Sequence, residues 1–239
     1  MENKKAIVNE LQQKILQWEG YKAPVAGVRP LLGLGPLEAA FPNGVFPVVA
    51  VHELICASTE QAASSGGLVT GILSVLMQKG GICVWIGRAR RIFAPSLSLF
   101  GVEPHQVIFI SLIKDKDALW VMEEALKCGG LTAVICEVKE LSFKHSQRLQ
   151  LAVEQSRVTG FVLRNEMAKL DSTACTARWR VSAMPSADMN GLPGLGYLRW
   201  QIELLKVRNG QPGKWTLEWQ NGNFISVEKE LALVERKVG

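Results

Sequence analysis

The stretch that decides the fold is Val48–Met77, VVAVHELICASTEQAASSGGLVTGILSVLM. Its apolar start, Val48–Leu54, predicts a buried strand, and the Ser and Gly residues at 64–67 predict a loop. The segment Leu68–Gln78 then predicts a helix. A strand, a loop of small residues and a helix, in that order, form the layout of a phosphate-binding loop. The stretch therefore predicts the first unit of an α/β protein of the nucleotide-binding type.

The predicted loop lacks the side chains that act on a triphosphate. A phosphate-binding loop supplies backbone N–H groups for the anion, a lysine for the β- and γ-phosphates and a Ser or Thr hydroxyl for Mg²⁺. Gly67 stands in the lysine position and Leu68 in the hydroxyl position, and the next cation, Lys79, lies about three helical turns further on. We therefore expect no bound cofactor at the degenerate loop Ser64, Ser65, Gly66 and Gly67.

Strand and helix patterns alternate through the middle of the chain. Apolar strands are predicted at residues 81–87, 107–110, 131–138 and 159–163. The segments between them predict helices at residues 95–100, 115–127 and 142–155. All-apolar strands belong to sheets that are covered on both faces, and short βα connections favour parallel strands with right-handed crossovers. We expect an α/β fold with a doubly wound, mostly parallel sheet.

The pattern changes after residue 165. Alternating strands are predicted at residues 177–184, 198–207 and 215–219, with turn signals at Asn209-Gly210 and Asn221-Gly222. These strands are expected to be antiparallel and to extend the sheet. Their tryptophans have two interpretations, which are packing across strands and stacking on nucleic-acid bases.

The N-terminal segment has a helical pattern of apolar residues, and the segment that follows it has none. Residues 1–19 predict an amphipathic helix with Ile7, Leu11 and Ile15 on one face, and these three are candidate oligomer contacts. Residues 20–36, rich in Pro and Gly, predict a linker. The predicted organisation is thus a helix, a linker, an α/β core over residues 37–165 and a C-terminal β extension of the same domain over 166–239.

Composition narrows the class of protein. The 239 residues are enough for a large core, and five cysteines without metal-like pairs suggest buried free thiols in a reducing cytosol. No leader and no membrane span is predicted, and the three histidines are too far apart in sequence for a metal site. The net charge of +5 suits an acidic partner or nucleic acid and specifies neither. We expect a cytoplasmic protein without a metal.

Two longer segments carry a resemblance to a known family. From PLLGLGPLEAAFPNGVFPVVAVHEL, which ends in the first strand, to the hairpin LLKVRNGQPGKWTLEW near the end, the chain resembles the RecA-like fold. Within that fold it is similar to the ImuA family, which is related to the cell-division inhibitor SulA. The resemblance implies a non-catalytic accessory protein of SOS-induced, error-prone translesion synthesis. Its implied partners are an ImuB-like Y-family polymerase homologue and an error-prone replicative-type polymerase.

Compared with active RecA-type ATPases, this chain also lacks a general base. The second core strand is followed by Arg88 and Arg90, where the resemblance would place the carboxylate that polarises the attacking water. Glu137 lies near the Walker-B position, and Asn165 stands where active relatives carry a nucleotide-sensing amide. Glu137 is either a remnant of that chemistry or a strand-end carboxylate that binds loop amides. We expect no ATP hydrolysis.

The basic residues are candidate contacts for partners or DNA. In RecA relatives the basic hairpin approaches the nucleotide of a neighbouring protomer, and its residues here are Lys206 and Arg208. The full set of candidates is Arg88, Arg90, Arg91, Lys206, Arg208 and Lys214. DNA, RecA and a second copy of the chain are further partners that the resemblance allows.

Two other functions remain open at this stage. One is a SulA-like inhibitor of cell division, which would bind the tubulin-like division protein. The other is a divergent nucleotide-dependent recombinase or ATPase. A test of nucleotide binding distinguishes the divergent ATPase from the accessory role. The identity of the partner distinguishes the SulA-like inhibitor from the accessory role.

Overall fold

The computed structural model describes residues 32–88, 94–165, 171–186, 194 and 196–227. The predicted helix at residues 1–19, with its candidate contacts Ile7, Leu11 and Ile15, lies outside these residues. So do Arg90, Arg91 and the first part of the predicted linker. The compact unit that contains the described residues begins at Leu32.

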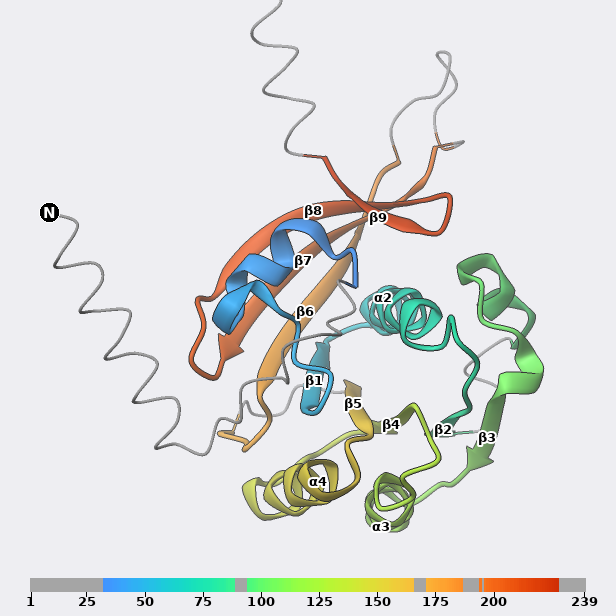
Figure 1. The fold of residues 1–239 in the computed structure, drawn as a ribbon, viewed down its shortest axis with the longest axis vertical. Helices are drawn as coiled ribbons and strands as arrows, with labels where there is room; N and C mark the ends of the chain where they lie inside the picture. The colour runs from blue at the N-terminus through green and yellow to red at the C-terminus, as the bar shows by residue number, and fades with distance from the viewer. Residues whose placement is uncertain (1–31, 89–93, 166–170, 187–193, 195, 228–239) are drawn as a thin grey trace, which may run out of the picture. The chain divides into compact units, whose positions relative to one another are not determined.

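One nine-stranded sheet forms the framework, in the order β3-β2-β4-β5-β1-β6-β7-β8-β9 (Figure 1). The strands are β1 Val51–Cys56, β2 Cys83–Gly87, β3 Val107–Ser111, β4 Ala133–Val138, β5 Thr159–Asn165, β6 Ala177–Met184, β7 Leu198–Val207, β8 Gly213–Gln220 and β9 Asn223–Ser226. Strands β1 to β6 pair in parallel, whereas β6 to β9 are antiparallel. The predicted α/β sheet with antiparallel C-terminal strands is confirmed, and β9 is an additional strand.

Helices cover the two faces of the parallel part of the sheet (Figure 1). The helices are α2 Thr59–Leu76, α3 Asp115–Leu126 and α4 Phe143–Ser156, and the short 3-10 helices are η1 Gly35–Ala40, η2 Pro42–Gly44, η3 Ala94–Phe100 and η4 Pro104–Gln106. α2 lies on one face, and α3 and α4 lie on the other, so each face has its own apolar cluster. None of the helices in the described part of the chain is long and apolar enough to cross a bilayer.

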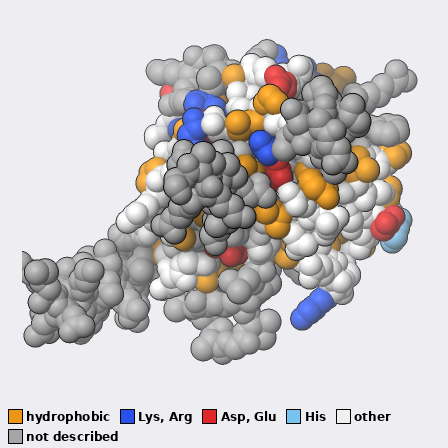
Figure 2. Space-filling view, turned by 90° about the horizontal axis from the view of Figure 1, so that it is seen from above, with side chains coloured by type: hydrophobic (Ala, Val, Ile, Leu, Met, Phe, Trp, Pro, Cys, Tyr) orange, Lys and Arg blue, Asp and Glu red, His pale blue; other side chains and the backbone are white. Residues whose placement is uncertain are grey.

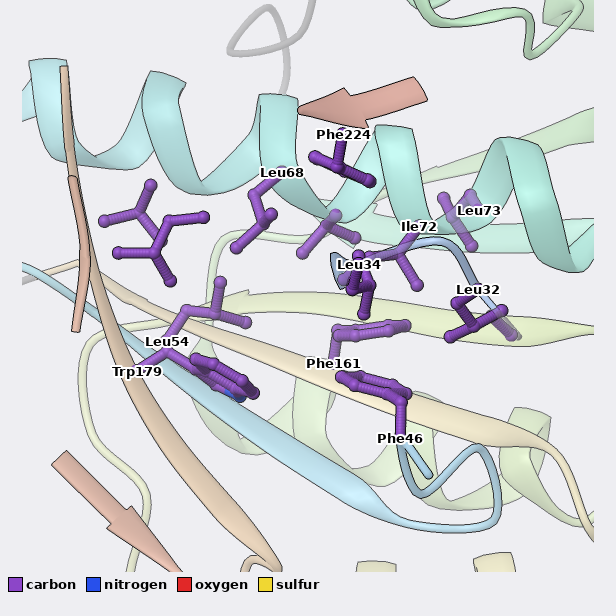
Figure 3. Close-up of a cluster of buried hydrophobic side chains, with 14 of the residues drawn as sticks. Leu32, Leu34, Phe46, Leu54, Leu68, Ile72, Leu73, Phe161, Trp179 and Phe224 are labelled. Atoms are coloured by element: carbon purple, nitrogen blue, oxygen red, sulfur yellow. The ribbon is translucent and has the colours of Figure 1, made fainter. Parts of the chain in front are cut away.

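The cluster under α2 is the larger one, and it includes residues that the sequence assigned to a linker. Figure 3 shows Leu68 and Ile72 of α2 above Phe161 of the sheet, with Leu32 and Leu34 beside them. Leu32 is 2% exposed and Leu34 is fully buried. The prediction of a linker that extends to residue 36 is therefore wrong for its last residues. Their leucines alternate with glycines, and the apolar side chains are drawn into the core.

His52 of β1 lies inside the same cluster. Its ring stacks on Phe46 with 4.4 Å between ring centroids. Its Nε2 donates to the carbonyl of Pro47 at 2.8 Å, and Nδ1 accepts the indole N–H of Trp179 at 3.4 Å. These contacts fit a neutral imidazole. Burial lowers the pKa of His52 to about 4, although the Pro47 carbonyl acts in the opposite direction.

Four of the five cysteines are buried thiols, as the composition suggests. Burial raises the pKa of Cys83 and of Cys175 to about 12. It raises the pKa of Cys136 still further. Such thiols stay protonated at neutral pH and act as small apolar side chains.

Candidate functional site

The connection between β1 and α2 is the position at which a phosphate-binding loop would lie. Here it consists of Ala57 and Ser58 alone, and α2 begins at Thr59. The Ser58 hydroxyl accepts the N–H of Gln61 at 3.2 Å, and the Gln61 side chain accepts the N–H of Ala57 at 2.9 Å. This reciprocal cap uses N–H groups that a phosphate would otherwise bind. The side chains of Ser58 and Gln61 therefore engage two of the N–H groups at the helix start.

The predicted Ser/Gly loop is wrong, because Ser64, Ser65, Gly66 and Gly67 lie inside α2. The Ser64 hydroxyl donates to the Glu60 carbonyl at 2.9 Å, within the same helix. Ser65 is fully buried, and its hydroxyl accepts the Cys56 thiol at 3.4 Å. These side chains face the protein interior, so they do not form a cradle for an anion.

The small residues of α2 instead let aromatic side chains of the C-terminal strands approach the helix. A Cβ atom at Gly67 would lie 3.0 Å from the ring of Trp200, and one at Gly71 would lie 2.5 Å from the ring of Phe224. Trp200 and Trp219 are only 4% and 6% exposed. Of the two interpretations of these tryptophans, packing holds for this pair. Close helix packing, and not phosphate binding, accounts for the glycines.

Glu137 and Asn165 do meet at the carboxyl edge of the parallel strands. The Glu137 carboxylate accepts the indole N–H of Trp85 at 3.1 Å and the side-chain amide of Asn165 at 3.5 Å. Gly87 of β2 lies so close that a Cβ there would be 3.1 Å from the carboxylate. Neighbouring strand ends thus hold Glu137 in place, which fits the interpretation as a structural carboxylate.

A small polar recess lies beside Glu137. Its lining residues are Arg88, Asp115, Glu137, Val138, Lys139 and Asn165. The Asp115 carboxylate accepts the N–H of Lys139 at 2.7 Å and so closes one side. The volume is about 10 Å³. That is room for about one water molecule and far less than a nucleotide requires.

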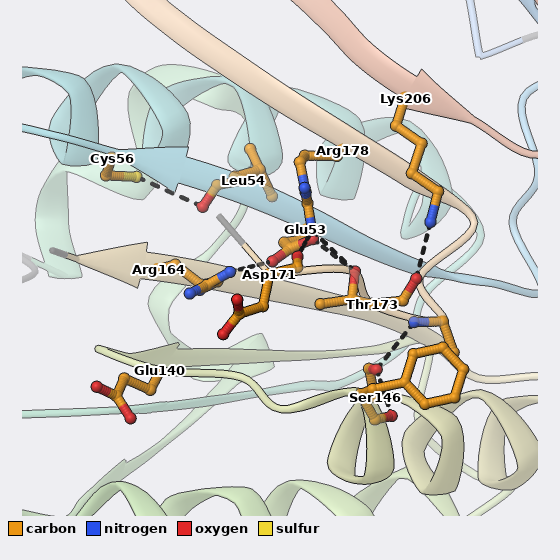
Figure 4. Close-up of polar contacts among 12 residues, drawn as sticks. Glu53, Leu54, Cys56, Glu140, Ser146, Arg164, Asp171, Thr173, Arg178 and Lys206 are labelled. Carbon is orange, nitrogen blue, oxygen red and sulfur yellow. Dashed lines mark hydrogen bonds and ion pairs between the residues drawn. The ribbon is translucent and has the colours of Figure 1, made fainter. Parts of the chain in front are cut away.

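A second group of charges, which the sequence did not predict, surrounds Glu53 of β1 (Figure 4). Glu53 is fully buried. Its carboxylate binds Arg164 of β5 at 2.8 Å and Arg178 of β6 at 2.8 Å. The hydroxyl of Thr173 also donates to it at 2.8 Å. Buried charge is costly without partners, and this carboxylate has three. A lone acid within a buried apolar strand was the sequence signal that indicated such partners.

Lys206, a predicted partner contact, belongs to the surroundings of this group. Its ammonium donates to the Thr173 carbonyl at 2.8 Å, as Figure 4 shows. Lys214 pairs with Glu203 at 2.9 Å, and its side chain remains 55% exposed. Both lysines therefore have contacts within the chain, and both residues remain exposed.

The candidate basic residues do not form one surface. Arg88 follows β2 and lies at the carboxyl edge of the parallel strands. Arg208 is exposed and lies at the opposite edge, since its N–H donates to the carbonyl of Thr176, which precedes β6. On the face in Figure 2, Lys and Arg side chains lie at several separate places among hydrophobic and acidic ones. The described candidate residues thus lie at separate places, with Arg88 and Arg208 at opposite edges of the sheet.

Metal ligands were not expected from the sequence. In the parts of the chain that the structure describes, no three His, Cys, Asp or Glu side chains gather as a metal site requires. In the groups around Glu137 and Glu53, the polar side chains bind one another.

Comparisons with known proteins identify relatives of the chain in sequence and in fold. No family model matches the chain. The chain is 31% identical over 212 residues to Protein ImuA of Caulobacter vibrioides, in two strains, and this match covers 82% of the chain and 87% of that protein. The crystal structure of the RadB recombinase has a TM-score of 0.57 at 11% identity, and the match covers 83% of this chain and 99% of that one. The likeness to RadB shows the fold alone and confirms the RecA-like architecture.

Proposed function

The chain belongs to the ImuA family, and from this premise we propose that it is a RecA-like accessory protein of SOS-induced, error-prone translesion DNA synthesis that does not hydrolyse ATP. Family membership supports the repair role. The non-catalytic part rests mainly on one observation, the two-residue connection Ala57-Ser58 between β1 and α2, with the helix start capped by its own side chains.

The remaining polar groups support the same proposal. Stabilisation of the γ-phosphate in RecA-type chemistry needs a lysine, a Mg²⁺ ligand and a group that orients water. Glu137 is the carboxylate nearest to such a role, and it is engaged by Trp85 and Asn165 beside a recess of about 10 Å³. Each missing catalytic group is worth about two orders of magnitude or more in rate. Turnover above background is therefore not expected.

Measurement of ATP turnover by the full chain, with and without single-stranded DNA, tests this part. An active RecA protein serves as the positive control, and the Glu137→Gln variant is measured beside the natural sequence. We expect background turnover in all four combinations of protein and DNA. Turnover that DNA stimulates and Glu137→Gln abolishes would overturn the proposal in favour of a divergent ATPase.

The proposed partners are an ImuB-like Y-family polymerase homologue and an error-prone replicative-type polymerase. The tagged full chain is purified from DNA-damaged cells, and nuclease treatment removes contacts that DNA bridges. Recovery of the Y-family homologue after nuclease treatment supports the accessory role. Recovery of the tubulin-like division protein alone would replace it with the SulA-like role.

DNA and RecA are further proposed partners, and the exposed candidate residues Arg88, Lys206, Arg208 and Lys214 support this suggestion; Arg88 and Arg208 are tested first. Because they lie at opposite edges of the sheet, Arg88→Glu and Arg208→Glu are compared separately in a DNA-binding titration at two salt concentrations. A phosphate contact is identified by weaker binding and a smaller salt dependence. If both variants bind DNA as tightly as the natural chain does, these two residues are removed from the proposal.

A further inference from the structure

α3 and α4 lie side by side on one face of the parallel strands (Figure 1). Each helix follows a parallel strand, so both begin at the carboxyl edge of the sheet and run in the same direction. An ion pair between Arg148 of α4 and Glu123 of α3, at 2.8 Å, joins them. The Arg148 side chain is 51% exposed, so this pair lies at the surface. The outer faces of the two helices therefore adjoin and form one surface.

The outer face of α3 carries one row of side chains. Successive members of this row are three or four residues apart, which places them on one side of the helix, and they are Lys116, Trp120, Glu123 and Lys127. Trp120 is 61% exposed. The carboxylate of Glu123 binds Lys127 at 3.3 Å as well as Arg148. The row thus presents a large exposed indole, and its acid is already neutralised by cations.

The outer face of α4 carries a parallel row. Lys144, Arg148 and Leu151 share one side of this helix by the same spacing, and Leu151 is 52% exposed. Lys116 and Lys144 both lie in the first turn of their helices, so they lie at the same end of the two rows. Both lysines are exposed, and no ion pair within the described ranges engages either of them. The two rows therefore combine positive charge at one end with apolar side chains further along.

Five of these residues, which we call the α3–α4 surface, have the composition of a binding site for protein. They are Lys116, Trp120, Lys144, Arg148 and Leu151. The exposed face of a helix is normally polar. Tryptophan and arginine, in contrast, are enriched among the residues that anchor protein–protein interfaces. The row on α3 spans about 11 residues and about 16 Å, which is the length of a partner helix of about three turns.

We propose that the α3–α4 surface binds an amphipathic helix of a partner protein. A third helix can pack across two neighbouring helices and direct its side chains at i, i+4 and i+7 towards them. The apolar face of the partner helix contacts Trp120 and Leu151. Acidic side chains at one of its ends pair with Lys116 and Lys144, so the segment carries net negative charge. This inference rests on the proposed accessory function, which supplies the partner.

Charge distinguishes this occupant from two others. Residues 1–19 of the chain itself, which predict an amphipathic helix, contain three lysines and three glutamates and so have no excess of acid to match the two lysines of the surface. Nucleic acid fits less well, because Leu151 offers no ring on which a base could stack. In addition, Asp117 lies only about 100° round the helix from Lys116 and would repel a phosphate. An acidic amphipathic helix accounts for both the lysines and the apolar side chains.

The binding test uses the full chain and the purified Y-family polymerase homologue as the probe. Trp120→Ala removes an apolar anchor, and Leu198→Ala is its control, since Leu198 on β7 is 50% exposed and pairs with Trp219 of β8. We expect Trp120→Ala to raise Kd by about tenfold or more, and Leu198→Ala to change it by less than about twofold. Circular dichroism of each variant establishes that it is folded.

A charge reversal tests the acidic end of the partner helix. Lys116→Glu combined with Lys144→Glu should raise Kd by about tenfold or more at low salt. The difference from the natural chain should shrink as salt is raised, because salt screens exposed charges. Lys79→Glu, at an exposed position after α2, is the control and should change Kd by less than about twofold. An unchanged Kd for the double variant at low salt would contradict the acidic character of the segment.

Photo-cross-linking identifies the segment itself. A photoreactive residue replaces Gln155, which is exposed and lies one turn beyond Leu151 on α4, and Gln78, exposed after α2, is the control position. We expect the homologue to be captured from position 155 and not from position 78. The captured peptide should have apolar residues at i, i+4 and i+7 and a net negative charge. A basic peptide, or one in which apolar residues alternate as in a strand, overturns the proposal.

The outcomes separate this inference from the function on which it rests. If the homologue binds and the Trp120→Ala and lysine variants bind equally well, the docking site lies elsewhere and the accessory function stands. If the homologue does not bind the natural chain, the proposed partner fails, and the inference fails with it. Light scattering and a DNA-binding titration of the free chain test the other occupants. A dimer that Trp120→Ala dissociates identifies a second copy, and DNA binding that Trp120→Ala weakens by about tenfold identifies nucleic acid, and either result overturns the proposal.

Discussion

Protonation of His52 is opposed by its surroundings, because the neutral ring is buried and stacked on Phe46. Its pKa is about 4 in the folded chain against 6.5 for a free histidine. The unfolded chain therefore binds more protons between these pH values, and the free energy of unfolding falls as pH is lowered from 6.5 towards 4. We expect His52 to contribute a slope of up to about 1.4 kcal/mol per pH unit.

Urea unfolding at several pH values between 7.5 and 4.5 measures this slope. His52→Gln cannot titrate, so it should be less stable at pH 7 but show a flatter dependence on pH. His105→Gln, at an exposed position, is the control and should keep the natural slope. An identical slope for the natural chain and His52→Gln would contradict the assignment.

Glu53 provides a second prediction at a single residue. Replacement by Gln leaves the buried Arg164 and the partly buried Arg178 without their shared counter-ion. Removal of one partner from a buried ion pair costs about 3–5 kcal/mol. Lys214→Ala breaks the Lys214–Glu203 pair, in which the lysine is 55% exposed, and should cost less than about 1 kcal/mol. Urea unfolding of both variants at pH 7 makes the comparison, and equal costs would refute it.

The helix α2 allows a prediction at the scale of one element, through two of its glycines. A Cβ at Gly71 would lie 2.5 Å from the ring of Phe224, whereas no atom lies within 4 Å of a Cβ at Gly66. Gly66→Ala should therefore stabilise the protein by up to about 1 kcal/mol through helix propensity. Gly71→Ala should destabilise it by about 1 kcal/mol or more through overpacking. Thermal unfolding of the pair tests the sign, and a gain in Tm for both would show that the aromatic rings move aside.

The elements differ in how far the sequence predicts them, and α2 shows the reason. Strands β6 and β7 are predicted to the residue, because buried and partly exposed side chains alternate along most of each strand, as in a half-covered sheet. The start of α2 is predicted nine residues too late, at Leu68 and not at Thr59, because Ser and Gly are poor helix formers. Tertiary packing on Trp200 and Phe224 overrides that propensity. The signal that the sequence did offer was the Ser58–Gln61 capping box.

A lone acid in an apolar strand indicates that Glu53 has partners, but the sequence could not identify which residues they are. Arg164 and Arg178 lie 111 and 125 residues further along the chain, and only the strand order brings them to Glu53. In contrast, Glu137 and Asn165 are predictable as neighbours, because parallel strands end at the same edge. Local patterns therefore reveal strand ends, whereas pairing across β1, β5 and β6 requires the topology.

At the scale of the whole molecule, one continuous sheet predicts a single unfolding transition. α2 packs on residues of both the parallel and the antiparallel strands, so the two parts share the larger apolar cluster. Four of the seven tryptophans lie in β6 to β8, namely Trp179, Trp200, Trp215 and Trp219. Tryptophan fluorescence therefore reports mainly on these strands, and circular dichroism at 222 nm reports on the helices. We expect the two urea transitions to coincide, and midpoints that differ reproducibly would indicate separate units.

If the chain hydrolyses no ATP, as we propose from the short connection at Ala57-Ser58, this would also affect how an assembly that contains it comes apart. In an ATPase, hydrolysis limits the lifetime of a complex that is stable in only one nucleotide state, because the complex dissociates after the phosphate is released. A chain without ATP hydrolysis does not limit the lifetime of its complexes in this way. The lifetime of its complexes is then set by their dissociation rate constants, and their abundance by the concentrations of the partners. Disassembly after repair would have to come from dilution, competition or proteolysis.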